Sequence, residues 1–213
     1  MQTQFNTVVP KRKVFISYHH ENDQGYKDSL LKFNEDHKIF IDASVDTGEI
    51  DDSLSDEAVR RKIRDEYLAE STVTILLVGT ETKFRKHIDW ELYSSMFDGS
   101  VNKKSGILVI MLPSVNNGNF QAAHPGEKEK VHPECQSWIS IGSRTEYEQR
   151  HPYMPDRIID NLASGAKISV VPWGEKLTKE NLAFLIEAAF QGRDNCEYDL
   201  SRPMRRANYN PNS

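Results

Sequence analysis

KVFISY at residues 13–18, followed by HHEND at residues 19–23, is the most informative part of this sequence. Its first part is an apolar run of the kind that forms buried strands, and its second part is an abrupt polar cluster. In open α/β sheets, ligands bind in the crevice beyond the carboxyl ends of the strands. The pattern therefore predicts a first strand whose polar continuation borders a binding site.

Apolar runs alternate with segments of helical periodicity along the rest of the chain, which predicts the α/β class. Asn22 or Asp23 can cap a helix over about residues 24–36. Uncharged strand runs between amphipathic helices are typical of a parallel sheet covered on both faces. We expect further strands at residues 39–41, 73–78, 107–112 and 167–171, and further helices from Ser53 or Ser55, over about 87–97 and over about 179–191.

One domain is expected over residues 13–192, after a lead-in at residues 1–12. Residues 113–165 break the alternation with Pro, Gly, Asn and His, and we expect an irregular insertion there. Stretches of this length without regular structure are usually functional or partly disordered. The polar tail at residues 193–213 is expected to be mobile.

Size and composition fit one domain of a cytoplasmic protein. The 213 residues carry a formal net charge of −5, which argues against general nucleic-acid binding. No apolar run approaches the roughly 20 residues that span a bilayer, and the N-terminus does not have the pattern of a signal peptide. Cys135 and Cys196 are the only cysteines, which predicts a reducing compartment.

The order of these motifs resembles that of a TIR domain, a flavodoxin-like α/β fold with about five parallel strands and helices on both faces. Within that family the chain is most similar to the bacterial TIR-like proteins of Thoeris anti-phage systems. The resemblance covers about residues 12–112 and, more weakly, 166–191. It rests on KVFISY at 13–18, FIDAS at 40–44, VTILLVG at 73–79 and WEL at 90–92.

The resemblance implies cleavage of the nicotinamide–ribose bond of NAD, with Glu91 as the catalytic carboxylate. A carboxylate can stabilise the oxocarbenium-like ribose that remains when nicotinamide leaves. We expect Glu91 in the first turn of its helix, where the dipole favours the ionised form. Enzymatic TIR domains commonly carry Trp four residues before this Glu, whereas His87 stands there and Trp90 directly precedes Glu91. The local sequence alone favours an ordinary glutamate near a helix start.

Polar residues at the ends of the first two strands are the candidate substrate ligands. The resemblance implies that Ser17, Tyr18 and His19 bind the nicotinamide-side ribose and wall the pocket. The alternative is that Tyr18 packs in the core beside solvated histidines. Asp42 and Ser44 follow the second strand and would either contact ribose hydroxyls or cap the loop.

A basic patch of Lys83, Arg85, Lys86 and His87 precedes Glu91. It would hold the pyrophosphate near a helix N-terminus, or it is an ordinary solvated face. Trp90 joins the candidate substrate-binding residues because it is the immediate neighbour of Glu91 in the sequence.

No metal is expected, and NAD is expected as the substrate rather than as a cofactor. A zinc site needs about four well-spaced ligands. His124, His132 and Cys135 are the candidates in the long irregular segment, and Glu134 is the one further candidate close to them in sequence. A protease-like pairing of Cys135 with a histidine is disfavoured because no flanking protease signature is present.

The implied product is of the ADP-ribose class, either a cyclic isomer or a conjugate, and it would activate a separate effector. Self-assembly into TIR oligomers is a further expected interaction, without nucleic-acid or membrane partners. The alternative function is a TIR interaction module without catalysis. A receiver-like phosphorelay domain is disfavoured because the strand at 73–78 leads into Gly79-Thr80 and not into an aspartate.

Overall fold

Five parallel strands form one sheet in the order β2-β1-β3-β4-β5, which confirms the predicted α/β, flavodoxin-like fold. β3 and β4 are buried along their whole length because both faces of the sheet are covered. The strands are β1 (Lys13–Ser17), β2 (Ile41–Asp42), β3 (Val73–Val78), β4 (Gly106–Met111) and β5 (Ser169–Pro172). The computed structural model describes residues 10–44, 54–100, 102–116 and 118–209.

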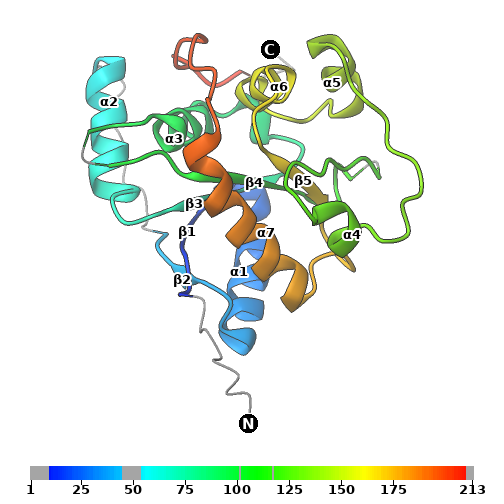
Figure 1. Ribbon diagram of the computed structural model, residues 1–213. Helices are drawn as coiled ribbons and strands as arrows, with labels where there is room; N and C mark the ends of the chain where they lie inside the picture. The colour runs from blue at the N-terminus through cyan, green and yellow to red at the C-terminus, as the bar shows by residue number, and fades with distance from the viewer. Residues whose placement is uncertain (1–9, 45–53, 101, 117, 210–213) are drawn as a thin grey trace.

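Helices cover the two faces of the sheet in separate layers (Figure 1). One face carries α1 (His20–His37) and α7 (Lys179–Gly192), with the short α4 (Glu127–Val131) beside α7. The other carries α2 (Asp56–Lys62), a π-helical turn (Ile63–Tyr67), α3 (Lys86–Met96), α5 (Arg144–Arg150) and α6 (Asp156–Ala163). Short 3-10 turns occupy Thr82–Phe84 and Arg193–Asn195. In the part of the chain that is described, no helix combines the length and apolar character that a membrane crossing requires.

Neighbouring residues of β1 point to opposite helix layers. Ile16 packs with Leu30 of α1 in one core cluster. Phe15 packs with Trp90 of α3 in a cluster on the other face. Because side chains alternate along a strand, Ser17 shares the face of Phe15. The last residue of β1 therefore points toward α3.

α7 crosses the sheet in close contact with β4 at Gly106. A Cβ at this position would lie 2.1 Å from the carbonyl oxygen of Ala189. Only glycine leaves room for so close an approach of two backbones. Gly106 therefore permits the close packing of α7 on the central strands.

Two expectations about irregular segments differ from the structure. Residues 113–165 contain α4, α5 and α6, which have five, seven and eight residues and are shorter than the windows of about 11 to 18 residues over which helical periodicity is judged. The expected mobile tail is instead packed over residues 193–209, where Cys196 and Met204 are buried. The side-chain amide of Asn161 on α6 also donates to the carbonyl oxygen of Asp199 at 3.0 Å and accepts the Asp199 N–H at 2.8 Å.

Candidate functional site

The predicted strand-end site lies where the strand order reverses, between β1 and β3. β1 ends at Ser17, whose hydroxyl donates a 2.6 Å hydrogen bond to Oε2 of Glu91 on α3. Both residues are buried, with exposed fractions of 1% and 5%. The fold thus brings together two candidate site residues that are 74 positions apart in the chain.

Burial raises the pKa of Glu91 to about 7. Removal from water disfavours the charged form of a carboxyl group. The hydrogen bond from Ser17 and the positive charge of Lys27 act in the opposite direction and lower this pKa. A carboxyl group that titrates near neutral pH at a strand-end crevice is a candidate for catalysis.

Glu91 does not lie in the first turn of its helix, contrary to the prediction. α3 begins at Lys86, so the acidic residue of its first turn is Asp89 and Glu91 follows in the second turn. The effect of the helix dipole falls off within the first turn. Burial therefore outweighs the helix dipole in its effect on the Glu91 carboxyl group. Burial favours the neutral form, whereas a position in the first turn would favour the ionised form.

Asp23 is a second acidic residue at these strand ends, where the sequence pattern predicts only a helix cap. α1 begins at His20, so Asp23 lies inside the helix. Its carboxylate packs against Gly79, where a Cβ would lie 2.4 Å from Oδ2. Burial raises the pKa of Asp23, while a hydrogen bond with Thr82 lowers it. The sequence feature that points to Asp23 as a site residue is its place in the polar cluster at residues 19–23.

His19 and Arg85 lie near each other beside the strand ends. Burial and then the charge of Arg85 lower the pKa of His19, which favours the neutral imidazole. Nδ1 of His19 has no hydrogen-bond partner among the described residues. Arg85 pairs with Glu81 at 3.6 Å. A neutral ring of this kind can accept or donate a hydrogen bond to a ligand hydroxyl.

Tyr18 and Trp90 face away from Glu91. Tyr18 belongs to the core cluster under α1, and its hydroxyl donates a 2.5 Å hydrogen bond to Gln24. Trp90 packs in the cluster of Phe15, and its Nε1 donates to the carbonyl oxygen of Arg205 at 2.7 Å. Residues that are adjacent in a helix project about 100° apart, so proximity of Trp90 to Glu91 in the sequence does not place it in the site.

Asp42 and Ser44 organise the loop after β2. Oδ1 of Asp42 accepts the Ser44 N–H at 3.0 Å, and Oγ of Ser44 accepts the Ile16 N–H at 3.2 Å. The first is a local bond of the kind that stabilises turns. The second connects the loop to β1, 28 positions earlier in the chain.

The predicted basic patch does not converge on one point. Lys83 donates a 2.6 Å hydrogen bond to the carbonyl oxygen of Pro152. His87 is exposed and meets the ring of Trp90 edge-on at 5.0 Å. Arg85 is the member of the patch whose charge acts on the strand-end cluster, through His19.

Glu91 is closed off from solvent in this conformation. The neighbouring pocket of about 210 Å³ is lined by Thr82, Arg85 and Asp89 together with residues of α6 and the tail, and Glu91 does not line it. A ligand as large as NAD can therefore reach the carboxylate only after the side chains that cover it move.

No metal centre is formed within the described ranges, where no three His, Cys, Asp or Glu side chains converge. His132 instead stacks on Phe120, with ring centroids 4.0 Å apart. His124 packs against Gly192. Cys135 donates a hydrogen bond to the carbonyl oxygen of Ser137.

The chain matches a known protein family. Residues 15–117 match the family model described as Thoeris protein ThsB, TIR-like domain. The match runs from β1 to just beyond β4 and so includes both Ser17 and Glu91. No curated protein matches the chain.

Proposed function

We propose that this chain, a Thoeris-type TIR-like protein of an anti-phage defence family, is an enzyme that cleaves the nicotinamide–ribose bond of NAD. Glu91 is the proposed catalytic carboxylate. The observation that carries the proposal is the buried pair of Glu91 and Ser17 at the β1–β3 switch point. This is the position at which flavodoxin-like folds bind their ligands.

Breaking the C1′–N bond sends its electron pair to the nicotinamide nitrogen and leaves positive charge on the ribose. An ionised Glu91 would stabilise that charge most strongly in a site from which water is excluded. A pKa near 7 suits this role, because the cationic nicotinamide ring would itself favour the ionised carboxylate. Ser17 would keep one carboxylate oxygen in place, and a nucleophile then attacks C1′.

Other strand-end residues would position the substrate. The neutral imidazole of His19 would bond a ribose hydroxyl, and Arg85 would bind the pyrophosphate. Asp23 is added to the proposed site because its buried carboxylate lies at the same strand ends.

The proposed product is an ADP-ribose derivative, cyclic or conjugated, that activates a separate effector. Capture of C1′ by a group of the same molecule gives the cyclic form, and capture by an added nucleophile gives a conjugate. Self-assembly is a proposed way to move the side chains over Glu91. A TIR module without catalysis is the second candidate, and the low exposure of Glu91 favours it.

The test is to incubate NAD with the full chain in lysate from phage-infected cells and to identify the products by mass spectrometry. Glu91→Gln removes the charge, and Glu57→Gln is a matched control on the exposed face of α2. Wild type and Glu57→Gln should release nicotinamide, and Glu91→Gln should not. Equally negligible NAD loss in all three, with folded and assembled protein, would support the interaction module.

A further inference from the structure

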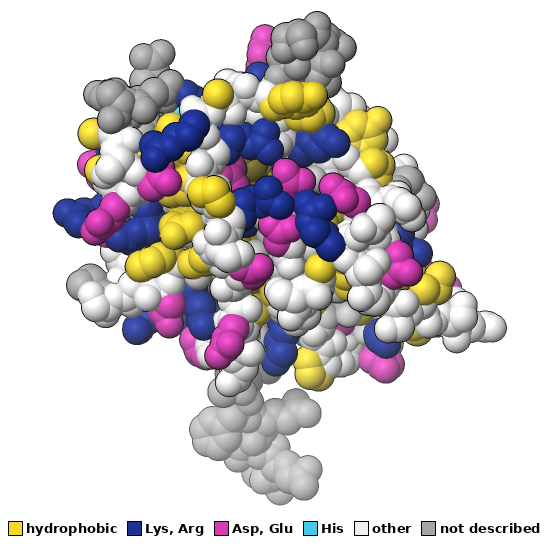
Figure 2. Space-filling view, turned by 90° about the horizontal axis from the view of Figure 1, so that it is seen from above, with side chains coloured by type: hydrophobic (Ala, Val, Ile, Leu, Met, Phe, Trp, Pro, Cys, Tyr) yellow, Lys and Arg dark blue, Asp and Glu magenta, His cyan; other side chains and the backbone are white. Residues whose placement is uncertain are grey.

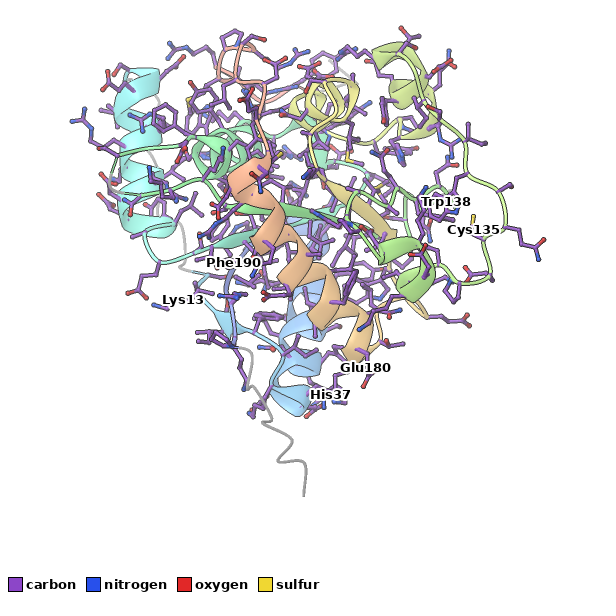
Figure 3. All side chains as sticks on the ribbon, in the orientation of Figure 1. Lys13, His37, Cys135, Trp138, Glu180 and Phe190 are labelled. Atoms are coloured by element: carbon purple, nitrogen blue, oxygen red, sulfur yellow. The ribbon has the colours of Figure 1, made fainter. Side chains whose placement is uncertain are left out.

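The connection between β4 and α5 forms a pocket that is separate from Glu91. Its volume is about 270 Å³. Gln121 on one wall pairs with Val170 of the edge strand β5 through hydrogen bonds of 2.8 and 2.9 Å. Trp138 and Cys135, which also line it, lie beside α4 (Figure 3). The pocket therefore lies at the β5 edge, whereas Glu91 lies at the β1–β3 switch point.

Two aromatic rings form a corner in this pocket. Phe120 stacks on His132 with an interplanar angle of 9°, and Trp138 meets Phe120 at 80° with centroids 5.6 Å apart. His132 is 1% exposed, so its ring supports Phe120 from the protein side. Phe120 and Trp138 are half-buried, and Tyr147 adds a third aromatic side chain to the lining. Such a corner offers one ring for stacking and another for an edge contact.

The same pocket is locally cationic. Nζ of Lys128 lies 4.5 Å from the ring centroid of Trp138, and Arg150 is also part of the lining. None of the described side chains that line the pocket is acidic. This contrasts with the formal net charge of −5 for the whole chain. The local field therefore favours an anion next to the aromatic corner.

We propose that this pocket binds a mononucleotide, with its base at the Phe120–Trp138 corner and its phosphate at Lys128. Aromatic platforms stack bases of any kind, and a lysine ammonium is a common phosphate ligand. The volume of about 270 Å³ is slightly below the usual range for drug-sized ligands, so it suits a mononucleotide better than an intact dinucleotide. The proposal does not depend on catalysis by Glu91.

Calorimetric titration of the full chain with AMP, adenosine and inorganic phosphate tests the site. AMP should bind saturably, and adenosine and phosphate should each bind more weakly. Lys128→Ala should weaken AMP binding about tenfold and leave adenosine binding unchanged, because it removes one charge-assisted contact. Lys130→Ala is the matched control on the same helix, since Lys130 lies over Phe184 and does not line the pocket.

Trp138→Ala should weaken both AMP and adenosine binding. Trp138→Leu is the alternative variant if circular dichroism shows that the alanine variant is misfolded. Absence of saturable AMP binding in the wild type would overturn the proposal. AMP binding that is unaffected by Lys128→Ala, or weakened equally by Lys130→Ala, would also overturn it, because the AMP would then bind elsewhere.

Discussion

Asp89 and Glu91 lie two residues apart on α3, and the protein surrounds them in opposite ways. Asp89 accepts hydrogen bonds from the Arg157 guanidinium at 2.8 and 3.0 Å and from the Arg205 N–H at 2.8 Å. Glu91 accepts one from the Ser17 hydroxyl. The exposed fractions are 8% and 5%, so burial does not distinguish the two acids. The two acids differ in their number of hydrogen-bond partners. The acid with fewer partners, Glu91, is the better candidate for catalysis.

The position of each acid on the helix explains this difference. Residues two apart in an α-helix project about 200° apart. Asp89 therefore faces α6 and the tail, and Glu91 faces β1. Arg157 also donates to the carbonyl oxygens of Arg202 and Pro203, which attaches the tail to the same ion pair. Figure 2 looks onto this helix layer, where Lys and Arg side chains lie among Asp and Glu.

The largest expected effect on stability comes from removing the cation that pairs with Asp89. Arg157→Met leaves the Asp89 carboxylate buried without its cation. We expect a loss of about 3 to 5 kcal/mol in the free energy of unfolding, measured by urea titration. Arg144→Met is the control, because the Arg144 side chain is 38% exposed and its ion pairs should contribute about 0 to 1 kcal/mol. Equal losses in the two variants would show that the buried pair has no special structural role.

Removal of the ionisable group of Glu91 should change stability in the opposite direction from removal of the Arg157 cation. A raised pKa means that the folded protein binds a proton more readily than the unfolded chain does. Wild-type stability should therefore fall as the pH rises from about 4.5 to about 7. Glu91→Gln removes this dependence and should be more stable than wild type at pH ~8 by up to about 3 kcal/mol.

Urea titrations at pH ~5 and pH ~8 measure this difference. Glu57→Gln serves as the control, because Glu57 forms an exposed ion pair with Arg61. A gain for Glu91→Gln that is larger at pH ~5 than at pH ~8 would mean that the folded protein favours the ionised carboxylate. The contrast between Asp89 and Glu91 would then be lost.

The Ser17 hydroxyl sets how far the pKa of Glu91 rises. Ser17→Ala removes the hydrogen bond that favours the ionised form, so this pKa should move above about 7. Stability at pH ~8 should fall by about 1.5 to 3 kcal/mol, with a smaller loss at pH ~5. Ser94→Ala is a matched control on α3, because the Ser94 hydroxyl is buried and has no partner among the described residues. A loss for Ser17→Ala that is independent of pH would contradict the assigned role.

The sequence predicted the surroundings of Glu91 better than those of Asp89. Apolar runs mark the strands, the rule that ligands bind at strand ends marks Ser17, and the resemblance to TIR domains marks Glu91. The partner of Asp89 lies 68 positions away on a helix of eight residues, where no periodic signal points to it. The arginines of the tail have the composition of a solvated segment, and only the fold shows that Arg202 and Arg205 pair with acids of α6. Asp23 was missed because a helix cap explained it without reference to Gly79.

The smallest expected effect concerns the start of α3, which precedes both acids. Arg85 occupies the N-cap position and gives no side-chain cap. Asn208 of the tail supplies one instead, because its Oδ1 accepts the Lys86 N–H at 2.9 Å. Asn208→Ala should reduce the free energy of unfolding by about 1 kcal/mol, as loss of a local cap does. Ser55→Ala, which removes the local cap of α2, is the control for the size of this effect.

Asn208→Asp separates capping from simple loss of packing. It retains the acceptor oxygen and adds negative charge at the positive end of the α3 dipole, so stability should be equal to wild type or higher by about 0.5 kcal/mol. Amide exchange at Lys86 should speed up in Asn208→Ala and not in Asn208→Asp, because only the first removes the Oδ1 acceptor of this N–H. Equal exchange in both variants would mean that Asn208 does not cap α3. The contacts of Asp89 and Trp90 with Arg205 would then attach the tail to the helix that carries Glu91.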